Sequence, residues 1–198
     1  FRLPVQWVKR PHADVRGFAG TIAGGSVRPG DEVVVLPSGR LSRVTAVIGG
    51  GGEVAAAESG ETVTVTLADE IDAVRGDMLA APRDRPQVAD QFAAHIVWMS
   101  DTALLPGRSY LMNINHNTLG ATVTELKHRL DVDTLSKFAA KTLARDEVGV
   151  CNLAVARPVA FGRRECFGFR GRKRRRGRRP ISPRTSCGAS VWRRASST

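Results

Sequence analysis

The chain has 198 residues, of which 42% are hydrophobic, so it can form one large domain or two small ones around a packed core. This composition excludes a wholly disordered chain. The net charge of +11 belongs to one end: residues 162–198 carry thirteen Lys or Arg and one acid, Glu165, whereas residues 1–161 sum to −1. The part expected to fold is therefore close to neutral, and the basicity belongs to a tail.

The first region, up to residue 82, predicts short strands separated by glycine and proline. Alternating or β-branched apolar runs occupy residues 3–8, 17–23, 32–36, 41–48 and 61–67. Arg28-Pro29-Gly30-Asp31 fits a type II turn, because proline suits its second position and glycine its third. Pro37-Ser38-Gly39 then reverses the chain into a hairpin. Short strands at this spacing predict a small closed barrel or a sandwich.

A second β-rich region follows a linker of proline and charged residues. Ala81-Pro82-Arg83-Asp84-Arg85-Pro86 cannot continue a central strand. Strand-like runs resume at residues 91–99, 109–114, 119–126 and 148–155. Residues 134–145 predict the one helix, because apolar residues from Leu135 to Leu143 recur near helical spacing; a loop turn packed on a barrel is the alternative.

The last region begins near Gly162. Residues 172–179 are almost continuous arginine, which repels itself and cannot bury apolar area, so we expect disorder there. Such a segment can bind polyanions nonspecifically through counterion release. It lacks the interleaved aromatic residues that stack on bases, which argues against specific RNA recognition.

Cysteine and histidine spacing gives no sign of a disulfide framework or a metal site. No two of the three cysteines form a CxxC pair; they are Cys151, Cys166 and Cys187. The four histidines are not spaced as metal ligands; they are His12, His95, His116 and His128. We therefore expect no bound metal and a reducing, cytoplasmic environment. No apolar run approaches the roughly 18–20 residues that span a bilayer, so no membrane role is expected.

Glycine clusters are the first candidates for a phosphate site. The sequence contains no GxxxxGK[ST] phosphate loop. Gly49-Gly50-Gly51-Gly52 is the nearest cluster, but no Lys-Ser or Lys-Thr follows it. We interpret it as a hairpin loop rather than a phosphate cradle, and Gly24-Gly25-Ser26 as a turn.

Acidic residues and one histidine are the remaining candidates. Asp69, Glu70 and Asp72 follow an alternating strand, and we interpret them as a solvated loop rather than a carboxylate cluster for acid–base or metal chemistry. His95 lies in a strand-like run, which favours a packed or surface histidine. No residue of this chain is therefore assigned a catalytic, cofactor-binding or metal-binding role.

Residues 16–33, RGFAGTIAGGSVRPGDEV, resemble the second domain of translation-factor GTPases. That family has a glycine-bearing strand ending in GTI, a glycine turn, a basic residue, and then GD before a β-branched strand. Glycine permits the positive φ of tight turns, and the Gly30-Asp31 corner starts the next strand. Arg75-Gly76-Asp77-Met78-Leu79 resembles the closing RGD signature of the same domain.

Longer strings resemble the large, GTPase subunit of bacterial sulfate adenylyltransferase. These are LPVQWV at residues 3–8, VADQFAAHIVWM at 88–99, LLPGRSYL at 104–111, AAKTLA at 139–144, VGVCNL at 148–153 and RPVAF at 157–161. The resemblance covers nearly all of residues 1–161. It leaves open whether the parent is the form fused to adenylyl-sulfate kinase.

The resemblance implies an all-β fold of two successive small barrels. Residues 1–82 would be the translation-factor domain 2-like barrel, and residues 87–161 the domain 3-like barrel, incomplete in this chain. In that family a GTPase domain precedes both barrels, and the protein pairs with a small subunit that forms adenylyl sulfate. GTP hydrolysis helps drive this reaction. Because the GTPase domain is missing, its GTP and Mg²⁺ sites fall on no residue here, and the fragment alone is expected to be inactive.

Residues 162–198 depart from the family, which continues with another segment rich in strand formers. A switched reading frame in GC-rich coding sequence would produce this arginine, glycine and serine composition; a genuine tail is the alternative. The alternative function is nucleic-acid binding, by translation-factor-like domains or by the Arg-rich tail. The aromatic-basic-proline cluster expected of a tRNA-binding third domain, such as YRPQF, does not occur. A barrel scaffold without activity is the third reading.

Overall fold

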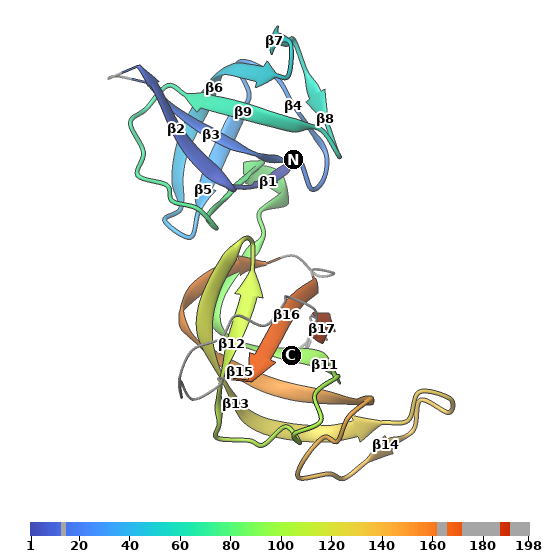
Figure 1. The fold of residues 1–198 in the computed structure, drawn as a ribbon. Helices are drawn as coiled ribbons and strands as arrows, with labels where there is room; N and C mark the ends of the chain where they lie inside the picture. The colour runs from blue at the N-terminus through green and yellow to red at the C-terminus, as the bar shows by residue number, and fades with distance from the viewer. Residues whose placement is uncertain (13–14, 162–165, 172–186, 191–198) are drawn as a thin grey trace, which may run out of the picture. The chain divides into compact units, whose positions relative to one another are not determined.

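The computed structural model describes residues 1–12, 15–161, 166–171 and 187–190. As predicted, the fold is all-β: apart from the short 3-10 helix η1 (Pro82–Asp84), every regular element in these ranges is a strand (Figure 1). The chain forms two compact units. The first comprises residues 1–88, 115–117 and 159–161, and the second residues 89–114, 118–158 and 162–198. The predicted linker contains η1.

The first unit is built on an antiparallel sheet that curls on itself. In spatial order its strands are β1 (Arg2–Pro4), β10 (Met78–Ala80), β5 (Glu32–Leu36), β6 (Arg40–Gly49), β9 (Thr62–Leu67), β3 (Val15–Thr21) and β2 (Trp7–His12). β7 (Gly52–Glu53) pairs with β6, while β4 (Ser26–Val27) and β8 (Ala57–Glu58) form a separate ladder. Backbone bonds of 2.8 Å from Arg2 N to Gly24 O and from Ala23 N to Arg2 O join β1 to the segment after β3. The two ends of the sheet are thereby brought together.

The strand patterns of the sequence account for the core of this unit. Four successive residues of β5, from Val33 to Leu36, are buried, and in β9 the buried Val63 and Val65 alternate with the more exposed Thr62 and Thr64. The main cluster contains Val33, Val35, Val63 and Val65 together with Leu3, Val5, Phe18, Ile22, Val27, Val44, Val47, Ile71 and Leu79. Val34 and Leu36 belong to a second cluster that includes Met78 and Ala80. Burying a side chain of this size contributes about 1.5–3 kcal/mol, so the main cluster holds the curled sheet together.

Two turns follow the predicted chemistry. Gly30 has φ +92°, the left-handed conformation that a type II turn requires at this position, and Asp31 N donates to Arg28 O at 3.2 Å. In the RGD turn, Gly76 has φ +90° and its N–H donates to Val5 O at 2.8 Å. Asp77 Oδ2 accepts a hydrogen bond from Val74 N at 2.9 Å. The RGD signature therefore fixes the start of β10 against the chain between β1 and β2.

The second unit is a sheet in which the first and last long strands also pair. Its order is β12 (Ser109–Ile114), β16 (Cys166–Gly171), β17 (Cys187–Ser190), β11 (Gln87–Trp98), β15 (Glu147–Phe161), β13 (Asn117–Leu130) and β14 (Lys137–Phe138), with a further pairing between β12 and β13. That pairing closes the ring. β16 and β17 lie beyond residue 161 and stand between β12 and β11 in the sheet. The ring is therefore complete only with these two strands of the tail.

An aromatic pair lies in the core of this unit. Trp98 is 2% exposed, and its ring meets Tyr110 edge to face, with centroids 5.5 Å apart. Trp98 Nε1 donates to Thr102 O at 2.7 Å, and Tyr110 Oη accepts from Leu105 N at 2.9 Å. Both polar tips are therefore satisfied inside an apolar cluster, as buried Trp and Tyr require.

The predicted helix at residues 134–145 is wrong. The structure has a turn, the short strand β14 and further turns there. Leu135 has φ +56°, outside the helical region, and most residues from 132 to 142 are exposed, so the apolar spacing does not create a buried helical face. Of Leu135, Phe138, Ala139 and Leu143, the apolar residues near helical spacing, only Leu143 is fully buried.

The tail is described only in part. Its first strand, β16, pairs with β12 from Asn113↔Gly168 to Tyr110↔Gly171, and β17 pairs with β16 and β11. The arginine-rich residues 172–179 lie outside the described residues. The domain limits 1–82, 87–161 and 162–198, and disorder or a changed reading frame in the tail, stay predictions.

Candidate functional site

The acidic residues after β9 are paired. Asp69 Oδ2 accepts a hydrogen bond of 2.7 Å from Ser42 Oγ. Arg16 lies on β3 and is the first residue of the RGFAGTI segment. It forms ion pairs with Glu70 at 3.2 Å and with Asp72. The hydrogen bond to Asp72, opposed in part by burial, raises the pKa of the Arg16 guanidinium. A fixed positive charge within the acidic loop disfavours binding of a metal cation there.

No metal site emerges elsewhere in the part of the chain that the structure describes. Within it, no group of three or more His, Cys, Asp or Glu residues is placed to hold a metal ion. Cys166 and Cys187 lie on β16 and β17, whose side chains are not described. The side chain of His12 is likewise outside the described residues.

The four-glycine cluster forms the hairpin between β6 and β7, as predicted. Ile48 pairs with Glu53 and Gly49 with Gly52, whose φ is +119°. Gly24-Gly25-Ser26 forms the predicted turn before β4, with Gly25 at φ +72°. Both clusters thus use glycine for backbone reversal.

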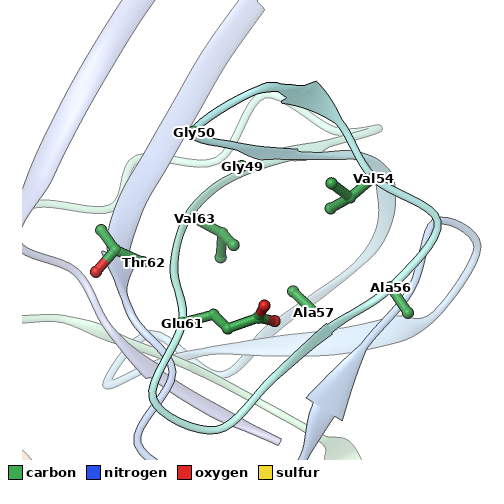
Figure 2. Close-up of a pocket in the computed structure, with 8 residues that line it drawn as sticks. All are labelled: Gly49, Gly50, Val54, Ala56, Ala57, Glu61, Thr62 and Val63. Atoms are coloured by element: carbon green, nitrogen blue, oxygen red, sulfur yellow. The ribbon is translucent and has the colours of Figure 1, made fainter.

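A pocket of about 300 Å³ lies beside the hairpin (Figure 2). Its lining residues are Gly49, Gly50, Val54, Ala56, Ala57, Glu61, Thr62 and Val63. Figure 2 shows the Glu61 carboxylate directed towards Ala57, and its Oε2 accepts a hydrogen bond of 2.6 Å from Glu58 N. The lining contains one carboxylate and no Lys or Arg. A phosphate group would therefore meet like charge, so these residues do not fit the triphosphate of GTP.

Two histidines lie on strands of the second unit. His95 is on β11 and His128 on β13, the two strands that flank β15. Burial, and then the charge of His128, lowers the pKa of His95. Burial, and then Lys137 and Lys127, lowers the pKa of His128. Both imidazoles are held towards the neutral form by apolar surroundings and neighbouring positive charge.

These shifts predict that the second unit loses stability as the pH falls through the unfolded-state histidine pKa of about 6.5. In the unfolded chain both histidines titrate near pH 6.5, so below that value the unfolded state binds more protons than the folded state. Stability is then lost as the pH falls towards the lower folded pKa values. Thermal melting at several pH values would measure this. The variant His95→Gln/His128→Gln should show a flatter pH dependence, and an unchanged dependence would contradict the assignment.

Cys151 lies on β15 and is fully buried. Burial raises the pKa of its thiol to about 12. Because the thiolate is the reactive form, this side chain is suited to packing rather than to nucleophilic catalysis. None of the candidate residues that the sequence singled out is brought together into a catalytic arrangement in the described structure.

One family model matches part of the chain, and several known proteins match most of it. The family model "GTP-eEF1A C-terminal domain-like" matches residues 91–172. The bifunctional enzyme NodQ of Rhizobium sp. (strain N33) is 54% identical over 161 residues, covering 81% of this chain and 25% of its own. Sulfate adenylyltransferase subunit 1 of Chromobacterium violaceum is 46% identical over 170 residues, covering 85% and 36% respectively. Over this segment the chain is a homologue of sulfate adenylyltransferase subunit 1.

The resemblance that the sequence indicates is therefore confirmed, and the chain spans only about a quarter to a third of the length of these relatives. The family match runs to residue 172, past the expected limit at 161, and includes β16. The Chromobacterium violaceum homologue carries the name subunit 1, which implies a further subunit in the family. None of the helices within the described ranges combines the length and apolarity that crossing a membrane demands.

Solved structures show the same fold at much lower identity. Sup35 complexed with GDP superposes with a TM-score of 0.80 at 20% identity, covering 98% of this chain and 47% of its own. The translation elongation factor SelB of Methanococcus maripaludis gives a TM-score of 0.76 at 18% identity, covering 98% and 43%. These similarities establish translation-factor β architecture and nothing about the ligand.

Proposed function

We propose that this chain supplies the two β units of the large, GTP-hydrolysing subunit of sulfate adenylyltransferase, which forms adenylyl sulfate and diphosphate from ATP and sulfate. The observation that carries the proposal is identity of 47% and 46% to two proteins named sulfate adenylyltransferase subunit 1, over 81% and 85% of the chain. A stretch this similar keeps the same packing.

The chemistry of the reaction belongs to other parts of the enzyme. The chain has no GxxxxGK[ST] loop, and the pocket beside the β6–β7 hairpin opposes a triphosphate electrostatically. GTP and Mg²⁺ would bind in the domain that longer relatives carry, and the small subunit would form adenylyl sulfate. The β units would contribute position and contacts to these partners, as loops on a rigid scaffold do.

A chimaeric subunit tests this proposal. Residues 1–161 would replace the homologous segment of the Chromobacterium violaceum subunit 1, which keeps its own residues on both sides. With the second subunit of that enzyme, the chimaera should form adenylyl sulfate in a GTP-dependent manner, at a rate within about tenfold of its parent. A folded chimaera that hydrolyses GTP but forms no adenylyl sulfate would contradict the proposal.

A further inference from the structure

Apolar side chains are exposed at the turn between β13 and β14. Val132 is 65% exposed, Leu135 74% and Phe138 45%. In Figure 1 this turn extends beyond the ends of the other strands of its unit. Single exposed hydrophobic residues are normal on protein surfaces, but three within seven residues at one projecting turn form a patch that indicates a contact.

The turn has a defined shape. Asp131 Oδ1 accepts hydrogen bonds from Asp133 N at 3.0 Å and from Thr134 N at 2.9 Å. Leu135 N donates to Asp131 O and Asp131 N to Ser136 O, both at 3.0 Å. The two backbone donors, Thr134 first, lower the pKa of the Asp131 carboxyl. The exposed side chains are therefore held in place by hydrogen bonds across the turn.

Leu135 occupies an unfavourable backbone conformation. Its φ of +56° lies in the left-handed region, where a bulky side chain is uncommon and glycine or asparagine is favoured. The same residue exposes about three quarters of its surface to solvent. A leucine here therefore gains neither backbone nor burial energy within the unit. Strain of this kind is typical of sites that bind another molecule.

Charged side chains of both signs border the exposed apolar side chains: Lys127 and Lys137 on the two strands, and Asp131 and Asp133 in the turn itself. Lys127 and Lys137 lie close enough to His128 to lower its pKa, after the larger effect of burial. The Arg129 guanidinium lies 5.7 Å from the Phe138 ring centroid and also pairs with Glu147, which fixes the base of the hairpin. An apolar centre with a charged border is the anatomy of a protein–protein interface, and the lysines of this border are complementary to carboxylates.

We propose that this turn surface, formed by Val132, Leu135 and Phe138 with Lys127 and Lys137, docks the second subunit of sulfate adenylyltransferase. The partner would meet it with an apolar patch bordered by Asp or Glu. This inference rests on the proposed function, because the homologues are one of at least two subunits. It assigns the contact to one turn of the second unit.

The test uses the 198-residue chain and the purified second subunit of the Chromobacterium violaceum enzyme. Calorimetry should show binding by the unchanged chain. The variant Val132→Ser/Leu135→Ser should raise the Kd at least tenfold, and Lys137→Glu should also raise it. A matched control, Leu41→Ser/Val74→Ser, removes two similarly exposed side chains of the first unit and should leave the Kd unchanged.

Leu135→Gly separates binding from folding. Glycine adopts positive φ without steric cost, so this variant should melt at the same temperature as the unchanged chain or higher. Its Kd should nevertheless rise about tenfold, as expected for a side chain that contributes to the centre of an interface. A purely structural Leu135 would show no loss of binding.

Three results would overturn the inference. One is equal binding of the second subunit by the unchanged chain and the Val132→Ser/Leu135→Ser variant. Another is a dimer of the chain alone that these substitutions dissociate, because the occupant is then a second copy. The third is no binding by the unchanged chain while the chimaera described above is active. In that case the proposed function stands, whereas an inactive, folded chimaera contradicts the function itself.

Discussion

Replacing Trp98 by Ala should lower the free energy of unfolding of the second unit by about 4 kcal/mol. The side chain is almost fully buried, it packs edge to face on Tyr110, and its Nε1 satisfies the carbonyl of Thr102. The substitution removes the largest buried side chain among the described residues of the unit and leaves a cavity. It also removes the hydrogen bond to Thr102 O. Denaturant unfolding can be followed through the reactivity of Cys151, with Cys166 and Cys187 replaced by serine, because the buried Cys151 thiol reacts only when this unit opens.

Trp7→Ala is the matched control. Trp7 is 61% exposed and lies on β2 of the first unit, so the change should alter stability by about 0.5 kcal/mol or less. If Trp98→Ala had as small an effect as Trp7→Ala, the packing of the second unit described above would be wrong.

The second large effect is expected for Gly20→Ala in the first unit. A Cβ on Gly20 would lie 2.3 Å from Pro4 O and 3.1 Å from Leu3 Cδ2. Because the nearest atom belongs to the backbone, β1 and β3 would have to move apart. We expect a loss of about 3 kcal/mol. Hydrogen exchange of peptides from β3 and β9 would report it as faster exchange in this unit.

Gly24→Ala provides the comparison within the same unit. No atom lies within 4 Å of the position of a Cβ there, and its backbone needs no positive φ. This variant should retain nearly the full stability of the first unit. Equal exchange rates in Gly20→Ala and Gly24→Ala would show that the approach of β1 to β3 is looser than described.

Local patterns predicted much of this fold. The runs at residues 32–36 and 109–114 coincide with β5 and β12, and the glycine turn at Gly30 has the predicted positive φ. Each of these depends on neighbouring residues alone: alternation sets a strand, and a turn sets its own backbone conformation. Such features can be inferred without knowing what packs against them.

Other features depend on partners that are distant in sequence. Gly20 is needed because a side chain at this position would collide with Pro4 O, and not because its backbone has a positive φ. The collision can be predicted only if the position of Pro4 O is known. Arg16 pairs with Asp72 across 56 positions, a contact that the sequence alone does not reveal, although the acidic loop is exposed as predicted. The helix predicted at residues 134–145 failed because helical spacing does not ensure that any of those side chains is buried. The turn surface at Leu135 had no sequence signal, since only the backbone angle and the exposure distinguish it.

Under the proposed function, this chain serves as a segment of sulfate adenylyltransferase and is not interchangeable with translation-factor β domains in general. The most direct measurement is the initial rate of GTP-dependent adenylyl sulfate formation by two matched chimaeras of the Chromobacterium violaceum subunit 1. One carries residues 1–161 of this chain, and the other the structurally equivalent domains of SelB, which share the fold at 18% identity. The first should approach the rate of the parent and the second should be inactive. Equal rates, or a folded first chimaera without activity, would contradict the account.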